Sequence, residues 1–329
     1  MHEEPTRAPL AEGGTPGGGD ETALVRLSVS KIAQKAQLLE PGRTAAVLVI
    51  PAGRDRPAPM AANVTLEMPE AIQGARRLTL FDRMTEDAIG NMMEERGAAG
   101  DFATTPEAVF RQMHGLPQNA TVSKASADMV NASMERLAST WITIDCKEHL
   151  QAARGTRIAG RFSHLAVKCN VITARLAEAR TRRGREIRVW KIAELPRIYA
   201  YSKAVRQMAA FPRAALAGKR QSPQIAAMRY FVLQQMPRIR HKRNGPDTPD
   251  ITYAAVFEAT GDELATRSTA CGRVKRSQRK RDLWAILDSL EECGVIKAWR
   301  EAGKAARGQF AGVRITPAPT RDIIEPEEE

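Results

Sequence analysis

The sequence predicts a helix-rich α+β protein in which one small unit occurs twice. Two observations support this fold class. Helix-like hydrophobic spacing gives way to strand-like alternation between residues 78 and 192, and the same change recurs between residues 223 and 316. In addition, a chain of 329 residues with 43% hydrophobic side chains is long enough for two domains, each with its own core.

The two ends of the chain contain little that could be buried. Residues 1–22 are rich in Gly, Pro and acidic side chains and should form a disordered N-terminal tail, and residues 317–329 should form an acidic C-terminal tail. The N-terminal segment 23–77 has no role that the sequence reveals. Within it we expect a strand at Ala45–Ile50 and a linker or exposed loop at Gly53–Asn63.

The first unit is predicted at residues 78–217 and begins with three helices. Gly97 should end the first helix, because glycine tolerates the left-handed backbone that often follows a helix. Pro106 should open the second helix after the Thr105 cap, and Ser123 should cap the third. In the third helix the side chains expected to face inward are Met129, Met134 and Leu137.

Strand-like runs and a basic turn follow these helices. The runs are Trp141–Asp145, Phe162–Ala174 and Glu186–Ile192, and the turn before the last of them is Arg180–Arg185. Three helices followed by a hairpin with a charged tip is the element order of a winged-helix domain. One or two amphipathic linker helices are expected to complete the unit at Leu195–Leu216.

The second unit, at residues 218–316, repeats this order. Its first helix should open at Ser222–Pro223 and lead into a basic loop, Arg238–Arg243, and its second helix should span Ile251–Ala259. The third helix should follow Gly272 and end at Gly294, and the hairpin should consist of Val295–Arg300 and Gly312–Thr316. The predicted fold is therefore two tandem winged-helix domains.

Positive charge is concentrated in two parts of the chain. The net charge is +12, and residues 151–245 contain 22 Lys and Arg but only three acidic residues. A second basic island, residues 273–281, directly precedes helical hydrophobic spacing at Leu283, Ile286 and Leu287. Such an imbalance favours a polyanionic partner, because a protein that neutralises nucleic acid releases bound counterions.

Other partners and cofactors are not indicated by the sequence. The four cysteines lack Cys-x-x-Cys spacing and no histidine lies at zinc-finger spacing, so we expect neither a metal nor a cofactor. No apolar run reaches the ~20 residues of a membrane span, and we expect a soluble, cytoplasmic protein without a membrane partner. Phosphate-loop, Gly-x-Ser-x-Gly and His-Glu-x-x-His motifs are absent, which argues against an enzyme.

Three groups of side chains are candidate contacts to double-stranded DNA. Most base reading should come from the basic island, whose members are Arg273, Lys275, Arg276, Arg279, Lys280 and Arg281. The hairpin tip should approach phosphates or the minor groove through Arg180, Arg182, Arg183 and Arg185. The third helix of the first unit, with a secondary or partner-facing role, should expose Lys124, Ser126, Asp128, Asn131 and Arg136. A solvated helix face or an exposed turn is the alternative interpretation of each group.

Two tyrosines leave open a metal-dependent nicking enzyme, in which Tyr199 or Tyr201 would attack the DNA backbone. Such enzymes need two closely spaced histidine ligands, whereas the histidines here are isolated. Two rings packed on the core are therefore the favoured interpretation. The tryptophans are likewise expected to be buried and not to stack on bases, at Trp141, Trp190, Trp284 and Trp299.

Three stretches together resemble a known family. Ser133–Ile144 is similar to the end of a third helix with its strand, Ser222–Leu233 to the opening helix of a second domain, and Lys280–Trp299 to a recognition helix with its wing. This order, over about residues 78–316, resembles the plasmid replication initiators of the two-winged-helix, Rep-like family. The resemblance implies binding to direct repeats in a plasmid origin, origin opening with host replication-initiation factors, and often a homodimer. A winged-helix transcriptional regulator and an RNA-binding or ribosome-associated protein remain alternatives.

Overall fold

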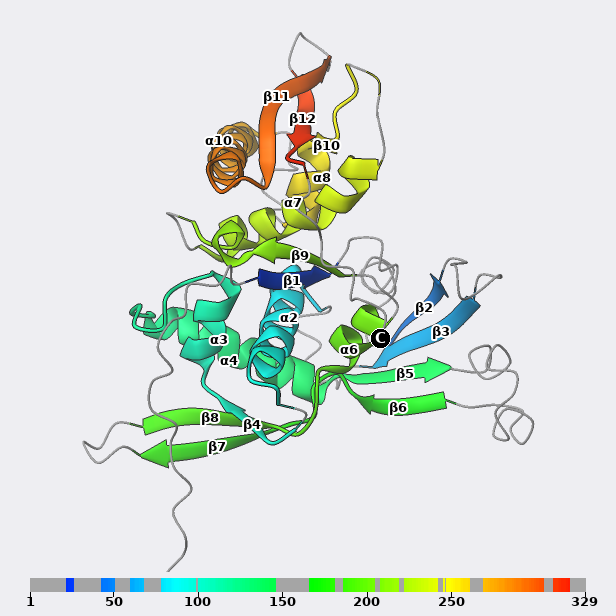
Figure 1. Cartoon of the computed structure of the whole chain (residues 1–329), viewed down its shortest axis with the longest axis vertical. Coiled ribbons are helices and arrows are strands. Elements are labelled where there is room, and N and C mark those ends of the chain that lie inside the picture. Colours follow the sequence, from blue (N-terminus) through cyan, green and yellow to red (C-terminus); the bar gives the residue numbers. More distant parts are fainter. Residues whose placement is uncertain are drawn as a thin grey trace, which may run out of the picture.

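The computed structural model describes residues 22–26, 43–50, 60–67, 78–98, 100–145, 166–180, 186–204, 208–218, 222–241, 245, 247–260, 269–304 and 310–319. Helices and small antiparallel sheets are mixed in them, which confirms the α+β prediction (Figure 1). The α-helices are α2 (Leu80–Glu95), α3 (Pro106–Met113), α4 (Lys124–Ser139), α6 (Arg197–Ala204), α7 (Pro223–His241), α8 (Tyr253–Ala259) and α10 (Ala270–Glu292). The strands are β1 (Thr22–Arg26), β2 (Arg43–Ile50), β3 (Met60–Glu67), β4 (Phe102–Thr104), β5 (Trp141–Asp145), β6 (Ala166–Asn170), β7 (Ala174–Arg180), β8 (Glu186–Ile192), β9 (Met208–Pro212), β10 (Ile251–Thr252), β11 (Ile296–Lys304) and β12 (Phe310–Pro317).

The first unit places three helices on one small sheet. Apart from β5 and β6, which lie between α4 and β7 but belong to another sheet, its elements follow the order α2, β4, α3, α4, β7, β8. Its strands pair in the order β4-β8-β7. The pairing of Phe102 with Ile192 and of Arg180 with Glu186 sets the register. Strand β4, between the first two helices, therefore becomes the third member of the hairpin sheet.

The second unit has the same element order. Its elements follow as α7, β10, α8, α10, β11, β12, and its strands pair as β10-β12-β11. The repeated order of helices and hairpin is the one that the sequence pattern predicts. Strands β4 and β10 are not predicted, because strands of two or three residues are too short to show an alternating pattern.

Side-chain caps begin three helices of the first unit, two of them at the predicted positions. The hydroxyls of Thr105 and Ser123 accept backbone N–H bonds in the first turns of α3 and α4, at 3.3 and 3.1 Å. Thr79 and Asp82 form a capping box at the start of α2. Gly294 follows the end of α10 at a φ of 74°, a conformation that a residue with a Cβ adopts only with strain.

The N-terminal segment contributes to a second sheet, of strand order β2-β3-β5-β6, that the sequence does not predict. The strand expected at Ala45–Ile50 lies within β2, whereas the loop expected at Gly53–Asn63 overlaps β3. Because β3 pairs with β5 and β5 with β6, the Trp141–Asp145 run belongs to this sheet and not to the hairpin of the first unit. Partners so far apart in the chain leave no local signal.

Three further stretches differ from their predicted structure. Phe162–Ala174, expected as one strand, is divided between β6 and β7 where it is described. Leu195–Leu216, expected to be helical, contains α6 and then β9, which pairs with the distant β1. The basic loop expected at Arg238–Arg243 begins inside α7, which continues past Pro237. Ile239 is buried at 8% exposure within the helix, which runs to His241, and Lys242 and Arg243 lie outside the described residues.

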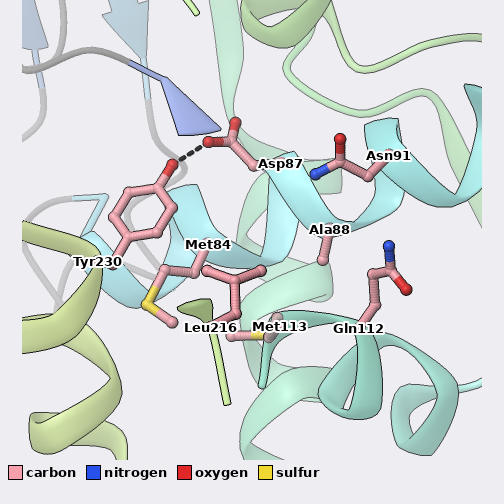
Figure 2. A pocket seen from close by; sticks show the side chains of 8 residues that line it. All are labelled: Met84, Asp87, Ala88, Asn91, Gln112, Met113, Leu216 and Tyr230. Carbon is pink, nitrogen blue, oxygen red and sulfur yellow. Dashed lines mark hydrogen bonds between the residues drawn. The ribbon is translucent and has the colours of Figure 1, made fainter. Parts of the chain in front are cut away.

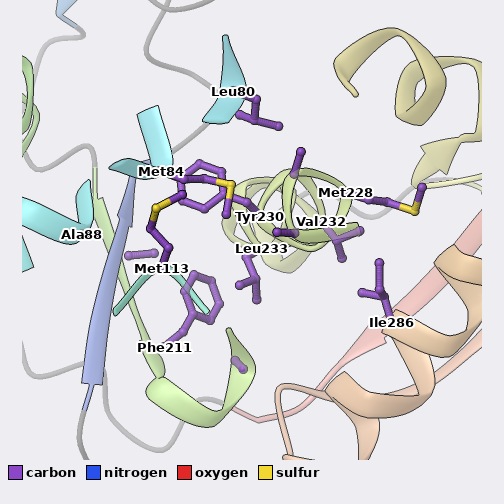
Figure 3. Close-up of a cluster of buried hydrophobic side chains, with 14 of the residues drawn as sticks. Leu80, Met84, Ala88, Met113, Phe211, Met228, Tyr230, Val232, Leu233 and Ile286 are labelled. Carbon is purple, nitrogen blue, oxygen red and sulfur yellow. The ribbon is translucent and has the colours of Figure 1, made fainter. Parts of the chain in front are cut away.

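One continuous hydrophobic cluster joins the two units (Figure 3). Helix α7 lies in its middle, with Tyr230 and Leu233 near the first unit and Met228 on the side of Ile286 from α10. Met84 of α2 approaches from the first unit. The described residues therefore do not show the two separate cores that we expected, and the domain boundaries given above stay a prediction.

Two large side chains lie outside the core against expectation. Trp141 is 41% exposed and Met129 is 39% exposed. The buried face of α4 passes through Val130, Met134 and Leu137, so its neighbour Met129 points away from the core. Among the other tryptophans, Trp190 is buried as predicted, and the half-buried Trp284 and Trp299 stack with ring centroids 6.3 Å apart.

A small pocket lies where α2, α3 and α7 meet (Figure 2). It encloses about 10 Å³, enough for about one water molecule. The hydroxyl of Tyr230 donates a hydrogen bond to the carboxylate of Asp87 beside it. This bond joins α7 to α2 and so ties the second unit to the first. The lining residues are Met84, Asp87, Ala88, Asn91, Gln112, Met113, Leu216 and Tyr230.

His114, at the end of α3, should make folding stability depend on pH. Burial, followed by the nearby charge of Arg229, lowers the pKa of His114 from 6.5 to about 4. Between about pH 6.5 and pH 4, therefore, His114 is protonated in the unfolded chain but neutral in the folded chain. Stability that is fully present above pH 6.5 is lost as the pH falls toward 4, by about 2 kcal/mol between pH 7 and pH 5.

Denaturant unfolding at these two pH values, for the wild type and for His114→Gln, measures this contribution. Glutamine does not titrate, so the loss of unfolding free energy at pH 5 should be about 2 kcal/mol smaller in the variant. An equal loss in both proteins would show that His114 does not titrate as its burial implies.

Candidate nucleic-acid interface

Helix α10 carries the basic island that was predicted to read DNA. It begins after the Thr269 cap, whose hydroxyl accepts a hydrogen bond from the Gly272 N–H at 3.1 Å. The island is therefore itself helical, and no acidic residue lies between Ala270 and Arg281. Figure 1 shows α10 beside the hairpin of β11 and β12, at one end of the molecule.

The basic residues of the island lie on different sides of α10. Arg273 and Arg281 are exposed, Lys275, Arg276 and Lys280 are half-buried, and Arg279 is buried. Successive residues of an α-helix are rotated by about 100°, so a run of neighbouring cations cannot share one face. The structure thus leaves Arg273 and Arg281 as the most accessible guanidinium groups of the island.

Arg279 does not occupy the predicted position of a DNA contact. Its side chain is 8% exposed, and its Nη1 lies 3.2 Å from Oδ2 of Asp282, which is also buried. Leu283, one turn later on the same side of the helix, is fully buried in the core. The prediction for Arg279 is corrected because helical geometry turns this cation inward, where a carboxylate neutralises it.

Lys280 is held at the flank of α10 by an aromatic ring. Its Nζ lies 4.2 Å from the ring centroid of Tyr253 in α8, a cation–π contact. The Tyr253 hydroxyl accepts a hydrogen bond from Trp284 at 3.1 Å and donates one to Glu301. Burial and the bond to Glu301 raise the pKa of Tyr253, so its hydroxyl keeps the proton that it donates.

The hairpin of the first unit is present, and its tip lies outside the described residues. Strands β7 and β8 pair from Ala174 to Arg180, where Arg180 is exposed opposite Glu186. The predicted contacts beyond that point are outside the described residues: Arg182, Arg183 and Arg185.

Helix α4 occupies the position in the first unit that α10 occupies in the second, and it carries fewer cations. Lys124 is exposed in its first turn, and Ser126 is half-buried with its hydroxyl 2.9 Å from that of Ser123. Asp128 places a negative charge on the same helix, 3.9 Å from Arg188 of β8. This mixed charge fits a weaker electrostatic attraction for phosphates than that of α10.

Two α4 residues that were predicted to be exposed have structural partners instead. Asn131 is only 4% exposed; it donates a hydrogen bond to Glu135 at 2.6 Å and accepts one from the Trp190 indole at 3.0 Å. Arg136 binds the buried carboxylate of Asp82 at 2.6 Å. The prediction for Asn131 as a DNA contact is therefore corrected, because its amide serves the core of the first unit.

Tyr199 is fully buried, as expected for a ring packed on the core. Its ring covers Gly90, where an added Cβ would come within 2.5 Å of ring atoms. Its hydroxyl has two acceptors for its single proton, Oδ1 of Asn91 at 3.3 Å and Oε2 of Glu94 at 3.1 Å. A phenol in this position has no access to a DNA phosphate. The side chain of Tyr201 lies outside the described residues.

Neither a metal-binding cluster nor a membrane-spanning helix occurs in the described ranges. No group of three or more His, Cys, Asp and Glu side chains there is arranged to hold a metal ion. No helix in those ranges is both long and apolar enough to cross a membrane. Two free cysteines are described, the exposed Cys271 and the half-buried Cys293.

The described residues form an α+β protein in which an order of helix, short strand, two helices and a hairpin occurs twice. No family model and no curated protein matches the sequence. Among solved structures, the selenomethionine derivative of domains 2 and 3 of RctB gives a TM-score of 0.42 at 11% identity, over 88% of this chain and 97% of that one. Another structure of RctB domains 2–3 gives 0.43 at 10% identity, over 86% and 96%. Similarity at this level carries no argument about what the chain does.

Proposed function

We propose that the chain is a sequence-specific, double-stranded-DNA-binding protein and that each of its units is a winged helix. The observation that carries this proposal is α10, the third helix of its unit, which is basic and free of acids from Ala270 to Arg281. An α-helix with side chains is about 10–12 Å wide, and the major groove of DNA is about 12 Å wide. A helix of this charge beside a hairpin is thus suited to enter that groove.

The particular function that we propose is replication initiation at a plasmid origin, by binding repeats and promoting origin opening with host factors. The tandem arrangement supports direct repeats as the target. A dimer reads a palindrome because its two-fold axis matches that of the DNA, whereas two unequal helices on one chain have no such symmetry. We propose that this activity involves no catalysis by the chain. The burial of Tyr199 supports this proposal, because a buried phenol is not positioned to attack the DNA backbone.

Purified protein should protect direct repeats about two helical turns apart in the DNA that flanks its gene. Footprinting with increasing salt tests this directly, because each phosphate contact contributes about −0.9 to the slope of log affinity against log salt. With about five phosphate contacts, affinity should fall by roughly 500-fold between 50 and 200 mM salt. A scrambled duplex of equal length and composition is the control and should bind much more weakly.

Each competing function predicts a different result in the same preparation. Protection of one palindrome would favour a transcriptional regulator. Tighter binding to structured RNA than to any duplex would favour a ribosome-associated protein. A covalent protein–DNA adduct formed on supercoiled origin DNA with Mg²⁺ would favour a nicking enzyme, and any of these outcomes would contradict replication initiation by this mechanism.

A further inference from the structure

We infer that Val274 is a specificity-determining residue that contacts the 5-methyl group of a pyrimidine in the major groove. The inference rests on the proposed DNA-binding function. Val274 is 70% exposed, compared with 46% for Phe310, the next most exposed large hydrophobic side chain of the described residues. A β-branched residue has a lower helix propensity than a straight-chain one, so neither burial nor helix formation explains valine here.

The position of Val274 on α10 places it opposite the core. Leu283, Ile286 and Leu290 define the buried side of the helix. Residues at i, i+3, i+4 and i+7 share one side of a helix, so Val274 lies in a row with three polar residues on the outer side. The row consists of Val274, Ser277, Gln278 and Arg281, of which only Gln278 is half-buried.

Two polar members of this row, Gln278 and Arg281, are held in place by hydrogen bonds. Gln278 donates to the buried Asp282 at 2.9 Å, and its carbonyl oxygen accepts from Arg281 at 3.1 Å. A guanidinium and an amide in one row are the groups that recognise guanine and adenine edges. Arg281 is thus oriented on the same side as Val274, about two turns further along the helix.

Single exposed hydrophobic residues are common on protein surfaces, so the exposure of Val274 indicates a DNA contact only together with its surroundings. Val274 lies in an acid-free basic segment, next to the exposed Arg273, on the outer side of the third helix of its unit. The major groove offers an apolar side chain one distinctive partner, the methyl group of thymine. A 5-methylcytosine presents the same group, so the shared chemistry is a pyrimidine methyl.

The test begins with selection of a preferred duplex from a random library by the wild-type protein. Each thymine of that duplex is then replaced singly by deoxyuracil, which removes only the methyl group. We expect one position at which the replacement weakens wild-type binding about fourfold, as for loss of one buried methyl-sized group. Val274→Ala should show no such loss. In a second arm, 5-methylcytosine replaces each cytosine. A gain in wild-type affinity that is absent from Val274→Ala would identify 5-methylcytosine as the source of the methyl group that Val274 contacts.

Two control variants separate this contact from general effects. Val274→Thr keeps one methyl group and should retain part of the discrimination. Glu292→Ala, on the same side of α10 about five turns away, should retain all of it. Because Val274 and Glu292 are both exposed, each substitution should change the free energy of unfolding by no more than about 0.5 kcal/mol, which thermal unfolding checks.

The outcomes distinguish this inference from the proposed function. If the wild type selects a duplex but no methyl change alters its affinity, or if Val274→Ala responds as the wild type does, the inference is overturned and sequence-specific binding stands. If the wild type selects no sequence at all, both are overturned.

Discussion

Replacing Arg273 and Arg281 together with alanine should weaken binding to the preferred duplex by roughly 2–6 kcal/mol, since each bidentate base contact contributes ~1–3 kcal/mol. Both side chains are exposed on α10. Fluorescence anisotropy with the preferred duplex and with a random duplex, at one fixed salt concentration, measures the loss. If these arginines read bases, affinity for the preferred duplex should fall more than affinity for the random one.

A matched double variant controls for the loss of two positive charges. Arg96 and Lys191 are exposed cations of the first unit, and replacing both with alanine removes the same charge from a different surface. This control should lose little specificity. An equal loss in both double variants would contradict the assignment of base reading to α10 and would indicate nonspecific attraction to DNA. Arg279→Ala should instead lower stability, because it leaves the buried Asp282 without its ion pair.

Replacing Asp82 with alanine should destabilise the first unit by about 3–5 kcal/mol, because it removes the fully buried carboxylate of an ion pair with the half-buried Arg136. The Asp82 carboxylate is fully buried and accepts hydrogen bonds from Thr79, Ser133 and Arg136. Its loss would leave the Arg136 guanidinium without its carboxylate and would remove both the α2 cap and the bond that joins α2 to α4. Denaturant unfolding followed by circular dichroism and tryptophan fluorescence measures the change.

Asp128→Ala is the matched control for this prediction. Asp128 also faces an arginine, but both side chains are at least half exposed and 3.9 Å apart. An exposed ion pair of this kind contributes no more than about 1 kcal/mol. Similar small effects for the two substitutions would show that the buried network does not stabilise the unit as proposed.

Much of the helical framework could be predicted, because its signals are local. Thr105 and Ser123 cap the helices that they were expected to cap, and Gly294 follows α10 as predicted. Hydrophobic spacing of 3.6 residues identified the buried side of α10 through Leu283 and Leu287. Capping, period and turn chemistry depend on residues within a few positions of one another.

The candidate site was predictable as a segment but not as a set of side chains. Charge density located the island on α10, yet Arg279 faces inward and Val274 faces out. Extending the helical period of the apolar residues back through the island would have separated the two. For Asn131 no such local signal existed, because its partner is the indole of Trp190, which lies on a distant strand.

The α+β class, the order of helices and hairpins and the place of the basic island follow from local sequence signals, because periodicity, capping and charge are properties of neighbouring residues. Which cations reach solvent and which strands pair depends on the tertiary fold. The pairing of β1 with β9 and of β3 with β5 joins segments that are far apart in the chain. Such pairings form because the folded chain forms backbone hydrogen bonds and buries apolar surface at the same time. No short stretch of sequence predicts them.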